Sequence, residues 1–231
     1  MAFEEIWALQ QQAGEKKGAW LWLQFGLEPW EANDSPYYGA ALAAVAVGTA
    51  PERYRIEPAI QNNLESLRKY LAREYETQPL MNLVVLLWAS TKLPGLLSPE
   101  QQHSIVSEIL RKQRADGGWS LISLSRRWTG WGLYSLVRIW LRSDATPYES
   151  RSDGYATGLI TFVMQEAGIR RDDAHLSAGL SWLVRNQNKA EGSWSGFSLN
   201  KRRTPSSDIG HFMSDAATGY AVLALADGKR N

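Results

Sequence analysis

The stretch QNKAEGSWSGFSLNKRRTPSSDIGHFMSDAATGYAVLAL, residues 187–225, joins a glutamine, a Gly-x-Trp turn, a polar loop and an apolar segment that opens at Asp215. The same order occurs in residues 113–119, QRADGGW, with DGYATGLITFVM following from Asp153. It occurs again in residues 12–20, QAGEKKGAW, with DSPYYGAALAAVAV following from Asp34. Three copies of one pattern predict a helical repeat protein.

The segments between these copies alternate in character. Residues 58–75 place Ile60, Leu64, Leu67 and Leu71 on one face of an amphipathic helix, whereas residues 79–88 are apolar on every side. This alternation suits two concentric rings of helices, with the amphipathic helices in the outer ring and the buried helices in the inner ring. We count four helical hairpins, and we expect residues 120–152 to be an insertion between repeats, with an extra helix at 128–141.

Composition excludes several classes of protein. Lys plus Arg is 25 and Asp plus Glu is 24, so the clustered basic excess of a nucleic-acid binder is missing. The chain has no cysteine, which rules out disulfides, thiolate zinc sites and cysteine nucleophiles. The N-terminus is acidic where a signal peptide is basic, and no apolar run approaches the length of a membrane span. We expect a soluble protein whose compartment the sequence leaves undetermined.

The repeated pattern resembles a known family motif. Residues 113–119 fit the Q-x3-G-x-W motif of squalene–hopene and oxidosqualene cyclases, and residues 187–194 and 12–20 fit it with one and two extra residues. The chain therefore resembles the terpenoid-cyclase and prenyltransferase superfamily. That resemblance implies an all-α fold, an α/α toroid (a closed barrel or an open arc) forming one domain over residues 1–231, alone or within a longer chain. It implies a structural role for Gln113, Trp119, Gln187 and Trp194.

Three aspartates and one histidine are the candidate catalytic residues. Asp34, Asp153 and Asp215 each precede an expected inner helix, where a carboxylate can cap the helix and face its dipole. If the inner helices start at one rim of a cavity, the same carboxylates line its mouth, where burial would raise a pKa and make an acid. His211, in the expected loop before Asp215, is the histidine nearest to that rim.

Aromatic residues are the candidate substrate-binding residues. Eleven tryptophans, nine tyrosines and five phenylalanines exceed what an ordinary helical core requires. Their faces can stabilise carbocations, stack on sugars or fill a core. The candidates near the proposed rim are Tyr37, Tyr38, Tyr155, Tyr220, Trp22, Trp30, Trp128 and Trp131.

The resemblance implies a protein that binds a hydrophobic isoprenoid in an aromatic-lined cavity and catalyses carbocation cyclisation or isomerisation. The Asp-x-Asp-Asp acid motif of squalene cyclases is absent, however, and the prenyltransferase zinc site lacks its cysteine. Two alternatives stay open: a non-catalytic ligand- or protein-interaction domain on the same fold, and a polysaccharide-active α/α toroid. We expect no metal, cofactor or nucleic acid. Contact with a membrane surface stays open, as does self-association or further repeats to complete the ring.

Overall fold

The computed structural model describes residues 2–125, 142–148 and 150–226. These residues form α-helices joined by turns and loops, with isolated bridges in place of any β-strand, which confirms the all-α prediction for the described part. The chain divides into two compact units, Met1–Ile105 and Val106–Asn231. The expectation of one toroid over the whole chain stays a prediction.

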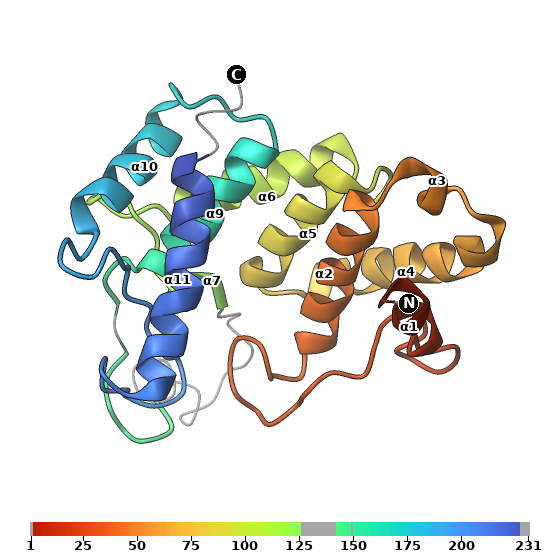
Figure 1. Ribbon diagram of the computed structural model, residues 1–231, viewed down its shortest axis with the longest axis horizontal. Coiled ribbons are helices and arrows are strands. Elements are labelled where there is room, and N and C mark those ends of the chain that lie inside the picture. The colour runs from red at the N-terminus through yellow and green to blue at the C-terminus, as the bar shows by residue number, and fades with distance from the viewer. Residues whose placement is uncertain (1, 126–141, 149, 227–231) are drawn as a thin grey trace. The chain divides into compact units, whose positions relative to one another are not determined.

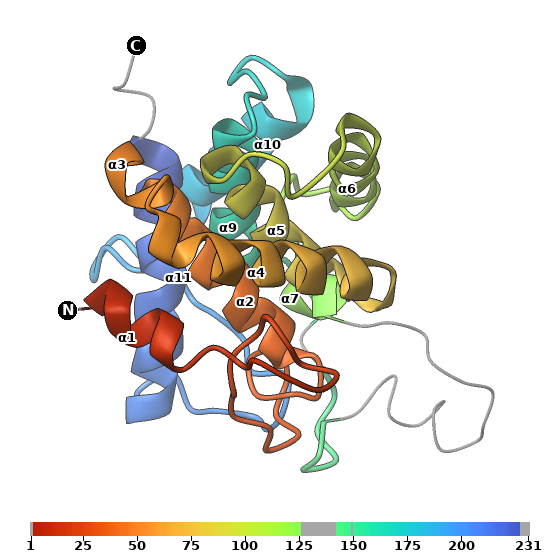
Figure 2. The ribbon, with the colours of Figure 1, turned by 90° about the vertical axis from the view of Figure 1, so that its right-hand side faces the viewer.

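Unit 1 is built on the packing of a small-residue helix against an apolar one, with the two helix starts side by side at Asp34 and Asn82 and the two ends at Gly48 and Lys92. It contains α1 (Ala2–Ala8), α2 (Ser35–Thr49), α3 (Glu52–Arg55), α4 (Gln61–Glu74) and α5 (Leu80–Lys92), with short 3-10 turns at Pro58–Ile60 and Tyr75–Thr77. The helices α2 and α5 lie side by side, and α4 packs against α2 (Figures 1 and 2). The first eight residues of α5, from Leu80 to Leu87, are buried, as expected for a helix without a polar face.

Unit 2 repeats this arrangement. It contains α7 (Leu121–Ser125), α9 (Gly154–Glu166), α10 (Ala174–Asn186) and α11 (Asp208–Ala226), while α6 (Pro99–Arg111) spans the division between the units. The helices α9 and α11 lie side by side, with α10 against α9 (Figure 1). Gly158 makes this approach close, because an added Cβ would lie 2.7 Å from the backbone nitrogen of Ala221.

Amphipathic and buried helices alternate as the sequence predicts from α2 to α10, whereas α11, expected as a buried inner helix, leaves Val222 and Leu223 about half exposed. In α4, only one stripe is buried, formed by Leu64, Leu67, Tyr70 and Leu71, whereas α9 is buried over its first eleven residues, from Gly154 to Met164. The first helix, α1, ends at Ala8, and Gln10 then forms an antiparallel bridge with Trp20. The helix expected at 128–141 lies outside the described residues.

Candidate functional site

Three loops have the same internal pattern of hydrogen bonds, and we name them loop A (residues 10–20), loop B (113–119) and loop C (187–194). In each loop the glutamine Nε2 donates to the carbonyl of the loop glycine, at 3.0, 2.8 and 3.0 Å for Gln10–Gly18, Gln113–Gly117 and Gln187–Gly192. The three loop glycines all have positive φ, which a side chain would strain.

The tryptophan of each loop closes the network onto the preceding helix. Its Nε1 donates to a carbonyl one helical turn before the glutamine, and the acceptors are Ile6 for Trp20, Ile109 for Trp119 and Leu183 for Trp194. These bonds are 2.6, 2.8 and 2.8 Å long, in the same order. Each loop therefore satisfies carbonyls at the end of the helix before it, which otherwise lack intrahelical partners.

Loop A departs from the sequence prediction in its first residue. The glutamine that bonds the loop glycine is Gln10, whereas Gln12 donates to the Gln10 carbonyl at 3.2 Å. Assigning Gln12 was wrong because the extra residues of this loop are inserted after the glutamine, as a turn with Gly14 at φ 74°. The spacing to the glycine alone does not locate the insertion.

Loops A and B also dock on the next amphipathic helix, α4 and α10 respectively. Gln10 donates to the Asn63 carbonyl at 3.0 Å, and Asn63 Nδ2 returns a 2.8 Å bond to Gln10 Oε1. Gln113 donates to the His175 carbonyl at 2.8 Å, and the His175 ring contacts Gln113 Oε1. His175 is thus part of a structural contact that sequence reasoning did not identify.

The docking continues along both helices with the same spacing. Gly18 lies against the Ser66 carbonyl and Gly117 against the Ala178 carbonyl, so closely that an added Cβ would lie 2.1 and 2.8 Å from the respective oxygens. About two helical turns after Ser66 and Ala178, Arg73 Nη2 donates to the Glu15 carbonyl, and Arg185 Nη2 donates to the Asp116 carbonyl. Loop and helix therefore make three matched contacts in each pair.

Asp153 is the buried carboxylate of the predicted set. It is 2% exposed and caps α9, accepting bonds from Ala156 N at 2.8 Å and from Leu121 N at 2.6 Å. Burial raises its pKa to about 6, against the lowering effect of these backbone N–H groups. The prediction that Asp153 caps its helix is confirmed.

Asp34 precedes α2 without capping it. Its backbone is helical, and its side chain makes no capping bond to the helix. One carboxylate oxygen accepts a 3.4 Å bond from Asn82 Nδ2 of α5. Asp34 thereby links the start of α2 to α5.

Asp215 and His211 do not lie where the sequence predicted. The helix α11 begins at Asp208, so Asp215 lies in its interior and His211 lies in its first turn, both exposed. The predicted start at Asp215 was wrong because Ser207 Oγ accepts from Gly210 N at 3.1 Å and starts the helix earlier. Asp215 is therefore not a helix-start carboxylate.

The four candidate tyrosines pack between helices. Tyr37 is fully buried and donates to the Leu71 carbonyl at 3.0 Å, and burial raises its pKa above its usual value. Tyr155 and Tyr220 meet edge to face, with ring centroids 5.3 Å apart, between α9 and α11. Tyr38 meets Trp22 in the same manner at 6.2 Å. Trp128 and Trp131 lie outside the described residues.

Residues 21–30, the aromatic loop, present large apolar side chains to solvent. Trp22 anchors this loop, because its ring packs on Gly39 and its Nε1 donates to the Trp30 carbonyl at 2.7 Å. The exposed members are Leu21 (77%), Trp22 (37%), Leu23 (55%), Phe25 (69%) and Leu27 (39%). An exposed cluster of this kind on an anchored loop is typical of a surface that contacts an apolar partner.

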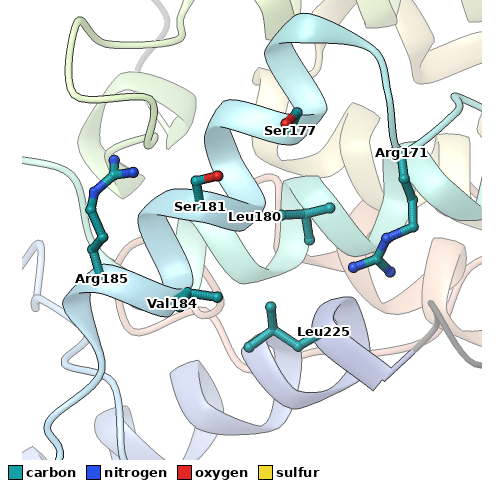
Figure 3. Close-up of a pocket in the computed structure, with 7 residues that line it drawn as sticks. All are labelled: Arg171, Ser177, Leu180, Ser181, Val184, Arg185 and Leu225. Atoms are coloured by element: carbon teal, nitrogen blue, oxygen red, sulfur yellow. The ribbon is translucent and has the colours of Figure 1, made fainter.

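A second feature is a shallow pocket of about 490 Å³ on one flank of α10 (Figure 3). Leu180, Val184 and Leu225 form its apolar part, with Ser177 and Ser181 beside them and Arg171 and Arg185 at its rim. Both arginines donate to neutral oxygens: Arg171 to Gln165 Oε1 and the Ala224 carbonyl, and Arg185 to the Asp116 carbonyl. The rim is therefore positively charged.

Among the described residues, no group of three or more histidine, aspartate or glutamate side chains could hold a metal ion. None of the described helices is long and apolar enough to cross a membrane. In comparisons with protein-family models, with curated proteins and with solved structures, nothing matches this chain.

Proposed function

We propose that the protein is a non-catalytic helical-repeat module of the α/α-toroid type, related to the terpenoid cyclases, that binds an apolar isoprenoid-like lipid through the aromatic loop. The observation that carries this proposal is the exposure of Leu21, Leu23 and Phe25 on a loop fixed by Trp22. A soluble chain rarely leaves so many neighbouring apolar side chains in water without a partner for them.

The energy available at this loop is sufficient for lipid binding. Full burial of a leucine or phenylalanine contributes about 1.5–3 kcal/mol. Leu21, Leu23 and Phe25 are each more than half exposed, so covering all three would contribute roughly 3–6 kcal/mol. Trp22 adds an amphipathic ring suited to a boundary between water and apolar chains.

The carboxylates support binding in preference to catalysis. Both oxygens of Asp153 accept bonds from backbone N–H groups, and Asp215 is an exposed residue in the interior of α11. A general acid needs a proton aimed at the substrate, and a helix-capping carboxylate has its oxygens committed elsewhere. The absence of the Asp-x-Asp-Asp string from the sequence agrees with this assignment.

The experiment is a titration of tryptophan fluorescence with squalene in phosphatidylcholine vesicles, with geranylgeranyl diphosphate, and with oligosaccharides. We expect a saturable blue shift with the isoprenoids, weakened about tenfold or more in the double variant Leu23→Ser, Phe25→Ser because two of the three most exposed apolar side chains of the loop are lost. The matched control is Val222→Ser, Leu223→Ser, which removes two similarly exposed apolar side chains from α11. Equal weakening by both double variants, or a response to sugars alone, would contradict the proposal.

A second candidate function is carbocation cyclisation, which one observation favours: Asp153 is a buried carboxyl whose pKa is raised to about 6. Product analysis after incubation with squalene or geranylgeranyl diphosphate tests it. Cyclic products that disappear in Asp153→Asn, while vesicle binding is kept, would establish this function over the first.

A further inference from the structure

Loop C has the same internal network as loops A and B but lacks the helix on which they dock. At Gly192, the one described atom within 4 Å of an added Cβ is Gln187 Nε2 at 3.9 Å, whereas Gly18 and Gly117 press against helix carbonyls. Gln187 Nε2 bonds the loop glycine, and its Oε1 accepts from Lys189 of the same loop at 3.2 Å. Within the described ranges, the docking face of loop C is open.

The flank of α10 beside loop C is open as well. Ser177, Ser181 and Val184 follow one another at helical spacing on one flank, Ala178 lies on the adjoining flank, where loop B docks, and Arg185 lies between the two, at the pocket rim and bonded to loop B. The pocket of about 490 Å³ lies on the open flank (Figure 3), where Val184 is 54% exposed. A helix seated on loop C would lie beside this flank, as α10 lies beside loop B.

We propose that loop C and the pocket flank of α10 form a docking site for an amphipathic helix of a separate partner. The two occupied pairs define its chemistry by shared spacing. The helix presents an amide or imidazole side chain (Asn63, His175), then a small residue (Ser66, Ala178), an aromatic residue (Tyr70, Trp182) and an arginine (Arg73, Arg185). An acidic residue on its flank toward Arg171 complements the positive rim.

Each position of this signature has a stated reason. The first side chain exchanges bonds with the loop glutamine, and the small residue lets the helix backbone touch the loop glycine. The aromatic residue packs at the loop glycine: Trp182 Nε1 donates at 3.1 Å to Oδ2 of Asp116, the residue before Gly117, and Tyr70 Cβ lies against Gly18. The arginine donates to the loop backbone, for which the carbonyl of Glu191 is the counterpart in loop C.

A second copy of this chain is a poorer occupant. Its α6 presents Gln101, Ser104 and Arg111 at the matching positions, with Ser104 and Arg111 exposed. At the aromatic position, however, α6 carries Glu108, whose carboxylate would face that of Glu191. Like charges at close range oppose association, so the site selects a helix with an aromatic residue there.

The probe is a capped peptide of residues 58–77, which carries the signature of α4. Glu65 and Lys69, which form an i,i+4 ion pair on the side away from the docking face, are joined as a lactam to hold the helix. Binding to the full-length chain is measured by fluorescence anisotropy. We expect saturable binding that weakens about tenfold in Gln187→Ala and stays unchanged in His103→Ala, an exposed residue of α6.

Two peptide variants test the signature itself. Leucine at the Ser66 position should abolish binding, because the added side chain separates the helix from Gly192, and alanine at the Arg73 position should weaken binding several-fold. Equal affinity of all three peptides, or no binding of the parent peptide at millimolar concentration, would overturn the proposal. Concentration-dependent dimers of the chain alone, lost in Gln187→Ala, would make a second copy the occupant and would overturn the assignment to a separate partner.

Discussion

Alanine at Gly117 should destabilise the protein by about 2–5 kcal/mol, and alanine at Gly192 by only about 1–2 kcal/mol. Both glycines have positive φ, 92° and 72°, so alanine pays a similar backbone cost of about 1–2 kcal/mol at either position. At Gly117 the new methyl would also lie 2.8 Å from the Ala178 carbonyl oxygen and 3.1 Å from its carbon. Overpacking of this kind adds about 1–3 kcal/mol.

The assay is urea unfolding followed by far-UV circular dichroism, with the free energy of unfolding compared at an unchanged denaturant slope. Alanine at Gly18 extends the series, because its methyl would lie 2.1 Å from the Ser66 oxygen and would force loop A away from α4. We expect losses in the order Gly18, Gly117, Gly192. Equal losses at Gly117 and Gly192 would refute the reasoning, since the backbone cost alone would then explain the loss of stability and the contact between loop B and α10 would contribute nothing to it.

Three further predictions concern single side chains. Gln113→Ala should cost about 1–3 kcal/mol of unfolding free energy, because it removes bonds within loop B and to α10, while Gln187→Ala should cost about 0.5 kcal/mol; urea unfolding of the pair measures the difference. Trp119→Phe should cost about 1–3 kcal/mol, because the buried Ile109 carbonyl loses its donor, and a thermal shift without loss of helical signal would show it. Asp153 holds its proton to about pH 6 when folded, but only to about pH 4 when unfolded, so raising the pH across this window destabilises the native state. The wild type should therefore lose about 3 kcal/mol relative to Asp153→Asn between pH 4 and pH 7, at about 1.4 kcal/mol per pKa unit, and parallel stability curves in urea would count against a raised pKa.

The sequence was sufficient for the helices and their kind, because burial on one face or all round leaves a periodic pattern. The stripe at Leu64, Leu67 and Leu71 predicted the amphipathic α4, and the apolar run from Leu80 to Trp88, interrupted only by Asn82, predicted the buried α5. Asp153 was also predicted as a helix cap, since a carboxylate before a glycine-rich helix start has a strong local preference for this role.

Alignment by aspartates failed at Asp215 because a cap is a local choice and another residue can take it. In α9 and α11, Thr157 and Thr218 accept bonds of 3.0 Å from the backbone nitrogens of Trp119 and Trp194, and each threonine precedes a glycine. Aligning these Thr-Gly pairs would have placed Ser214, and not Asp215, opposite Asp153. The Thr-Gly pair is therefore a better marker of equivalent positions in α9 and α11 than the aspartate is.

The docking contacts of loops A and B could not be predicted from the sequence, because they join residues that are distant in it. No local sequence pattern around His175 or Arg185 indicates that both bind loop B. Their spacing is recognisable only beside the residues of α4 that contact loop A at the same spacing. That match has a physical cause: a loop whose glycine touches a helix backbone fixes the helix both along its axis and in rotation. The glutamine and the arginine can then reach the partner on either side of the contact only at one spacing. Both occupied pairs have this spacing, and loop C has the same internal hydrogen bonds. A helix that binds loop C must therefore have the same spacing of side chains, which is a stricter requirement than an apolar patch alone would set.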